Sequence, residues 1–184
     1  YLHKTVLGAE YLLIQILKRA RMIYREGMAT PSVLKPFLSG QIPSNKIELV
    51  KLYAGLDDYD IMAAIKEWRY HTDPALSALC QRLLDRKLLG VQMAKEAWSE
   101  KQLQELRQKA IIEHNYSKEE AEFLIFQQKI TNNAYNPIKD RIQLLYKDGS
   151  LVDIAAAADQ LNISALTQTV VKYFLFAPKA ILKA

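Results

Sequence analysis

The residues at the start of the chain are the ones whose types and spacing could bind a ligand. Spaced three, four and three apart, they share one side of a helix: Tyr1, Lys4, Gly8 and Tyr11, with His3 beside them. Two rings, an ammonium group and a residue without a side chain could form one wall of a site for an anionic, ring-bearing ligand. Gly8 would then let the ligand or a neighbouring backbone approach closely. The alternative is that Gly8 admits a crossing helix and that the ring residues are ordinary, half-buried ones.

These residues lie on a helix that we predict from Tyr1 to about residue 26. Its apolar residues recur at steps of three and four: Leu2, Val6, Ala9, Leu13, Ile16, Ala20 and Ile23. A second apolar stripe lies to one side: Leu7, Tyr11 and Ile14. A helix that is apolar over more than half its girth is expected to lie between other elements. Because no N-cap precedes Tyr1, we expect the chain to be a piece of a longer protein.

Composition narrows the class of protein. The chain has 184 residues, of which 50% are hydrophobic and 24% charged, a balance typical of one medium globular domain or two small lobes. Its net charge of +5 permits binding of phosphates or nucleic acid without requiring it. A single cysteine, Cys80, excludes an internal disulfide framework and fits a cytoplasmic location. No apolar run approaches the roughly 18 residues of a membrane span.

Start and stop signals predict that the chain is helical up to residue 87. They mark a helix over 45–54 that ends at Gly55, a helix capped by Asp57, and a helix that begins at Asp73 and Pro74. The carboxylates at 57, 58 and 60 are interpreted as helix-capping groups rather than as a cation site. His71 is interpreted as a packing or hydrogen-bonding residue, because no catalytic partner lies near it in the sequence.

The remainder of the chain alternates between strands and helices. We predict, in order, a strand over 88–94, a helix from Ser99 to about 114, strands over 123–131, 142–146 and 151–154, a helix over 155–161 and a strand over 169–176. This order is the ferredoxin-like βαββαβ pattern. The expected fold is therefore mainly α with a small α+β lobe, divided into a helical domain over 1–87 and the lobe over 88–184.

No motif in this sequence makes an active site by itself. It contains no HExxH pair, no glycine-rich phosphate loop and no GxSxG nucleophile motif. We therefore predict no catalytic residue and no metal ligand within this chain.

Several segments, taken in order, resemble the HD-domain phosphohydrolases. The opening YLHK with the following AEYLL resembles the helix after the metal site of that family. Further similar segments are LDDYDIMAAI (56–65), TDPALSALCQRLLDRKLLGV (72–91), NPIKDRIQLLYKDG (136–149) and VVKYFLFAPK (170–179). The resemblance is nearest to the deoxynucleoside triphosphate triphosphohydrolases, which include the animal enzyme that joins a SAM domain to an HD domain.

The resemblance implies a helical HD-type scaffold and a metal-dependent parent enzyme that forms a homo-oligomer. The family holds a divalent metal with a His, a His-Asp pair and a later Asp, and these would all lie upstream of Tyr1. Tyr1 matches a position that lines the family's substrate pocket. His3 and Lys4 match positions near nucleotide phosphates.

Two hypotheses follow. In the first, the chain is a fragment of a metal-dependent HD-domain phosphohydrolase that acts on nucleotides, and it is inactive alone. In the second, it is a non-enzymatic module that binds nucleic acid or protein, or assembles an oligomer, through a basic face whose densest part is 18–25. No nucleic-acid-binding motif supports that partner. Salt-dependent binding to generic DNA or RNA would discriminate between the two.

Overall fold

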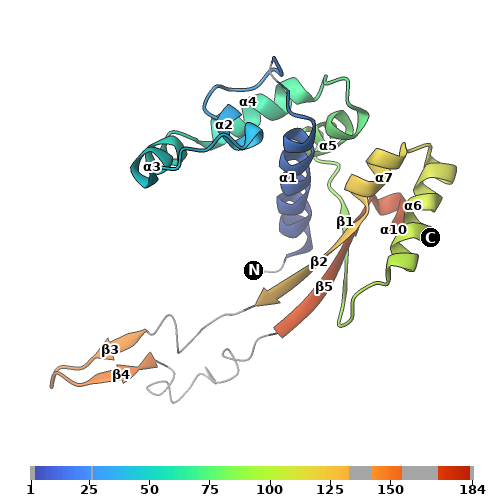
Figure 1. Ribbon diagram of the computed structural model, residues 1–184. Helices are drawn as coiled ribbons and strands as arrows, with labels where there is room; N and C mark the ends of the chain where they lie inside the picture. Colours follow the sequence, from blue (N-terminus) through green and yellow to red (C-terminus); the bar gives the residue numbers. More distant parts are fainter. Residues whose placement is uncertain (1–2, 26, 133–141, 155–169, 183–184) are drawn as a thin grey trace. The chain divides into compact units, whose positions relative to one another are not determined.

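A computed structural model describes residues 3–25, 27–132, 142–154 and 170–182 (Figure 1). The helices are α1 (Lys4–Ile23), α2 (Lys35–Ser39), α3 (Lys46–Ala54), α4 (Asp58–Trp68), α5 (Pro74–Leu84), α6 (Glu100–His114), α7 (Lys118–Leu124) and α10 (Lys179–Leu182). The strands are β1 (Gly90–Ala94), β2 (Phe126–Asn132), β3 (Gln143–Leu145), β4 (Leu151–Asp153) and β5 (Val170–Ala177). The prediction of a mainly helical chain with a small β-containing part is confirmed.

The chain forms two compact units, which are described separately. The first comprises Tyr1–Gln92, Trp98–Gln127 and Leu175–Ala184, and the second comprises Met93–Ala97 and Gln128–Phe174. Neither unit ends at residue 87. The division into a domain over 1–87 and a lobe over 88–184 stays a prediction.

The strands form two separate sheets in the part of the chain that the structure describes. One has the order β1-β5-β2, and the other is the hairpin β3-β4, in which Leu144 pairs with Val152 in antiparallel register. Gly149 adopts φ 85° in the connecting turn, and the Asp148 carboxylate accepts a hydrogen bond from the Ser150 N–H. Both strands of this hairpin were predicted, over 142–146 and 151–154. The ferredoxin-like arrangement is not confirmed, because β3 and β4 pair with each other in a sheet of their own. The helix predicted over 155–161 lies outside the described residues.

Helix α1 lies against α2, α5 and α7 within the first unit. Its buried apolar residues are Leu7, Leu12, Ile16 and Ala20, at steps of five, four and four. The predicted stripe is wrong at Val6, which is 58% exposed, because the neighbouring elements cover the face one residue further round the helix. The helix is also shorter than predicted, and it ends at Tyr24, whose φ of −55° and ψ of 128° are not helical.

Four helix starts follow from local hydrogen bonds. Asp57 and Asp60 form a capping box at α4, and Asp73 accepts a hydrogen bond from the Leu76 N–H at α5. Capping boxes of Ser with Gln and of Ser with Glu begin α6 and α7. The capping roles predicted for Asp57 and Asp73 are confirmed. The predicted strand over 123–131 is wrong at its start, because α7 extends to Leu124.

Two buried side chains show how the first unit excludes water. Trp68 is 1% exposed, and its indole N–H donates a hydrogen bond of 2.9 Å to the Ala29 carbonyl oxygen. Cys80 is fully buried, and burial raises the pKa of its thiol to about 12. Cys80 therefore acts as a small hydrophobic residue. Among the described helices, none has the length and apolar character needed to cross a membrane.

Candidate functional site

The predicted ligand-binding residues lie at the first turn of α1. His3 is the N-cap residue, although its side chain makes no capping hydrogen bond, and Lys4 is the first helical residue. Both side chains are exposed, and the first turn carries no acidic residue. Backbone N–H groups at the start of a helix lack partners within the helix and carry partial positive charge. This end of α1 is thus suited to an anion. Tyr1 lies outside the described residues.

Gly8 and Tyr11 face the interior of the first unit instead of continuing that ligand-binding surface. A Cβ atom on Gly8 would lie 3.0 Å from the carbonyl oxygen of Leu89, so a neighbouring backbone occupies the space beside it. The Tyr11 ring packs on Phe176 with 4.8 Å between the ring centroids. Burial and the charge of Glu10 raise the pKa of Tyr11. The prediction that Gly8 and Tyr11 join Lys4 in one wall of a ligand site is therefore wrong. The neighbour at Gly8 is the segment of chain before β1 rather than a crossing helix.

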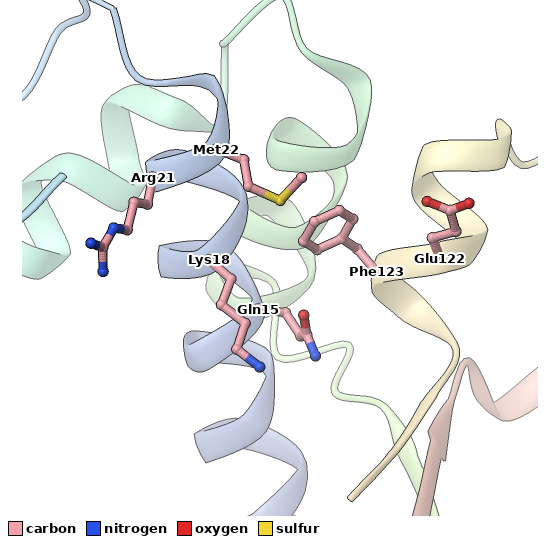
Figure 2. A pocket seen from close by; sticks show the side chains of 6 residues that line it. All are labelled: Gln15, Lys18, Arg21, Met22, Glu122 and Phe123. Atoms are coloured by element: carbon pink, nitrogen blue, oxygen red, sulfur yellow. The ribbon is translucent and has the colours of Figure 1, made fainter. Parts of the chain in front are cut away.

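A second site lies between α1 and α7 (Figure 2). It is a pocket of about 500 Å³, within the range of roughly 300 to 1,000 Å³ that is common for small-molecule sites. It is lined by Gln15, Lys18, Arg21, Met22, Glu122 and Phe123. In Figure 2, Met22 extends from α1 toward the Phe123 ring of α7.

Arg19 fixes the position of Phe123 at this pocket. Its guanidinium carbon lies 5.1 Å from the centroid of the Phe123 ring, a cation–π distance. Its Nε donates to Asp73 Oδ1 at 3.0 Å and its Nη2 donates to Asp73 Oδ2 at 2.6 Å, a bidentate pair. Since Asp73 also caps α5, this cluster joins α1, α5 and α7.

The pKa values in this cluster reflect the pairing of the two charges. The hydrogen bond with Asp73 raises the pKa of Arg19 against the opposing effect of burial. Burial alone would raise the pKa of Asp73, but hydrogen bonds from Arg19 and from the Leu76 N–H, together with the charges of Arg19 and His71, lower it. Both groups are therefore held in their charged forms.

Gln15 is a residue of this pocket that the sequence analysis did not single out. It is 8% exposed and is the one polar residue that is buried among those the structure describes. The signal in the sequence is a glutamine inside the apolar run from Leu12 to Ile16 of a helix expected to be covered on most sides.

Neither the histidines nor the carboxylates form a reactive cluster in the described part of the chain. The His71 Nδ1 accepts a hydrogen bond of 2.9 Å from the Asp73 N–H, which confirms its structural interpretation. No group of three or more His, Cys, Asp or Glu residues that could hold a metal ion occurs among the described residues. These residues therefore do not fit a metal centre.

Comparison with known proteins gives a match among solved structures. No known family profile and no curated protein matches this sequence. Among solved structures, the crystal structure of a phosphohydrolase from Bacteroides thetaiotaomicron superposes with a TM-score of 0.77. The two sequences are 33% identical over 96% of this chain and 45% of that protein.

The chain is similar to a phosphohydrolase. It spans less than half of that protein's length, and the similarity covers nearly all of this chain. The similarity to a phosphohydrolase, which the sequence predicted, is therefore confirmed.

Proposed function

We propose that this chain is the C-terminal portion of an HD-domain phosphohydrolase that acts on nucleotides, with deoxynucleoside triphosphates as substrates. The observation that carries the proposal is the match to a phosphohydrolase, with 33% identity and a TM-score of 0.77 over 96% of this chain. The order of the segments that resemble the HD-domain family supports the finer assignment.

In this proposal the first turn of α1 binds and orients the phosphate groups of the substrate. Lys4 supplies an exposed positive charge, and the unpaired N–H groups of the same turn point toward the same end of the helix. His3, which is also exposed, lies next to them. The resemblance adds Tyr1 as a residue that lines the substrate pocket.

The divalent metal of the proposed parent enzyme would be held by residues upstream of Tyr1. This chain's own part in the proposed reaction is to bind and position the substrate. We also propose that the parent is a cytoplasmic homo-oligomer, as the family resemblance implies.

The direct test uses the intact protein, together with any sequence that precedes Tyr1, supplied with Mg²⁺ or Mn²⁺ and each deoxynucleoside triphosphate. We expect release of phosphate or triphosphate from at least one of them. Failure to hydrolyse any nucleoside mono-, di- or triphosphate with either metal would contradict the proposal.

A matched pair of lysine variants tests the role of Lys4. Lys46 is also the first residue of a helix and is also exposed, and therefore Lys46→Ala serves as the control for Lys4→Ala. Lys4→Ala is expected to raise KM about tenfold, which corresponds to about 1.4 kcal/mol of binding free energy. Lys46→Ala is expected to leave KM unchanged. Equal kinetics for the two variants would remove Lys4 from the site.

A further inference from the structure

A further pocket, of about 360 Å³, lies between α1 and the segment that contains α2, α3 and α4, within the first unit. Its walls are mostly apolar, and they include Ile14, Leu17, Leu34, Phe37, Leu56 and Ile61. Leu34 is buried, and the other five side chains are half-buried, so they retain apolar surface that a ligand can cover. The volume is within the range of roughly 300 to 1,000 Å³ that is common for small-molecule sites.

Two cationic side chains, Lys18 and Arg21, line the same pocket. They are one turn apart on α1 and follow Leu17, so the positive charge lies toward the C-terminal end of this helix. Figure 2 shows Arg21 extending to the side of α1 away from Phe123. A Cβ atom on Gly40 would lie 3.8 Å from Arg21 Nη2, which places the guanidinium beside the end of α2. Among the described residues, neither cation makes an ion pair or a hydrogen bond with its side chain.

This arrangement restricts the chemistry of a ligand. Apart from the two cations, the polar side chain at the pocket is Tyr53, which is 70% exposed. A ligand with many polar groups would lose hydrogen bonds to water here without replacing them. A carboxylate, in contrast, would gain charge-assisted hydrogen bonds from a guanidinium or an ammonium group. The pocket therefore suits a molecule with an apolar body and a single anionic end.

The size of the pocket also favours a small molecule over a protein partner. Ten residues line it, whereas a stable protein–protein interface uses roughly 20 to 30 residues on each side. An alkyl chain can follow the apolar wall from Ile14 to Arg21, which are seven helical positions apart, or about 10 Å along the axis of α1.

We propose that this pocket binds a fatty acid, with the alkyl chain between α1, α2 and α4 and the carboxylate at Lys18 and Arg21. The pocket is separate from the first turn of α1, because Ile14 follows Lys4 by ten helical positions, about 15 Å along the axis. Binding requires neither hydrolysis nor a metal, so it is independent of the function proposed above.

The test is titration calorimetry of the intact protein with octanoate, decanoate, laurate and myristate, each below the concentration at which it forms micelles. Affinity is expected to rise about fourfold for each methylene group that is buried, until the pocket is full. Methyl laurate, which lacks the charge, should bind at least tenfold more weakly than laurate. Dodecyltrimethylammonium, which has the opposite charge, should bind most weakly.

A double variant, Lys18→Gln with Arg21→Gln, tests the two cations. Both residues are exposed, so the variant is expected to fold. It should weaken laurate binding at least tenfold and leave methyl laurate binding unchanged. Arg25→Gln, which removes an exposed cation outside the pocket, is the control and should not affect laurate. Lys4→Ala should also leave laurate binding unchanged, which separates this site from the proposed substrate site.

A change of volume tests the apolar part of the pocket. Leu17→Phe narrows the pocket and should shift the preference toward a shorter chain. Leu13→Phe is the control, because Leu13 is also half-buried on α1 but does not line the pocket.

The proposal is overturned if no fatty acid binds, if dodecyltrimethylammonium binds as tightly as laurate, or if the double variant keeps its full affinity for laurate. A dimer in sedimentation experiments that Leu17→Phe dissociates, without any binding of laurate, would assign the pocket to a second copy of the chain and would also overturn it.

Discussion

At the first turn of α1, His3 and Lys4 are exposed, and no described residue forms a hydrogen bond or ion pair with their side chains. In the middle of the same helix, the Arg19 side chain is 13% exposed and binds Asp73 from a different helix. Gln15, which is 8% exposed as a residue, lines the pocket between α1 and α7. One helix therefore carries polar side chains of three kinds: exposed to water, paired within the fold, and facing a pocket.

This difference in exposure and pairing separates the polar groups that stabilise the fold from those that are available to a ligand. Exposed charges contribute little to stability, whereas removing one member of a paired and partly buried set leaves the other without compensation. Lys4 is thus expected to affect binding only, and Arg19 is expected to affect folding first. The following substitutions test this ordering.

The largest loss of stability is expected for Arg19→Met. It leaves the Asp73 carboxylate, which is 15% exposed, without its partner and also removes the cation over Phe123. We expect about 3 kcal/mol less free energy of unfolding in urea. Arg25→Met is the control, because Arg25 is exposed. Similar losses of free energy of unfolding for Arg19→Met and Arg25→Met would show that Arg19 is no more important than a surface charge. If the double variant Arg19→Met with Asp73→Asn loses less free energy of unfolding than the two single variants summed, the pairing is confirmed.

A somewhat smaller loss is expected for Gly8→Val. The added side chain has no room, because its Cβ would lie 3.0 Å from the Leu89 carbonyl oxygen and 3.7 Å from a methyl group of Val91. Overpacking of this kind costs about 2 kcal/mol. Thermal unfolding measures the loss, and Thr5→Val, at an exposed position of the same helix, is the control. An unchanged melting temperature would mean that α1 can move away from the segment before β1.

Acid is expected to weaken the cluster around Arg19 in a defined direction. Because the folded protein holds the pKa of Asp73 below its usual value, the unfolded chain binds a proton at Asp73 more readily than the native protein does. The stabilisation is therefore complete above the ordinary carboxyl pKa of about 4 and is lost as the pH falls through the lowered value. Urea unfolding from pH 6 down to pH 2 measures this loss, and Asp73→Asn should show a shallower decline. If the free energy of unfolding declines equally with pH in the two proteins, Asp73 is not the source of the acid sensitivity.

The smallest effect on stability is expected at the first turn of α1. Lys4→Ala and His3→Ala should each change the free energy of unfolding by no more than about 0.5 kcal/mol, as is usual for exposed side chains. Lys4→Ala should nevertheless weaken substrate binding, as proposed above. A clear loss of stability in Lys4→Ala would mean that this end of the helix takes part in the fold and that the contrast with Arg19 does not hold.

The features that the sequence predicted well depend on residues near one another in the chain. Asp57 with Asp60 and Ser99 with Gln102 form capping boxes over three residues, and Asp148 with Gly149 forms the hairpin turn. Such local patterns determine their own hydrogen bonds, so the helix starts and the β3-β4 hairpin could be read directly.

The features that the sequence did not predict depend on which segments meet in space. Arg19 and Asp73 are separated by 54 positions, and periodicity gives no sign that they pair. The buried state of Gln15 likewise depends on where α1 packs. The wall proposed around Gly8 and Tyr11 was wrong for the same reason, since helical spacing places residues on a common side without showing which neighbour covers it.

The contact at Gly8 has a mechanical consequence for the first unit. Where two main chains touch directly, no rotatable side chain lies between them to absorb a displacement by changing rotamer. A shift of α1 along or across its axis would therefore push directly on the peptide group at Leu89. We expect the helix and the segment leading into β1 to move together as one rigid piece.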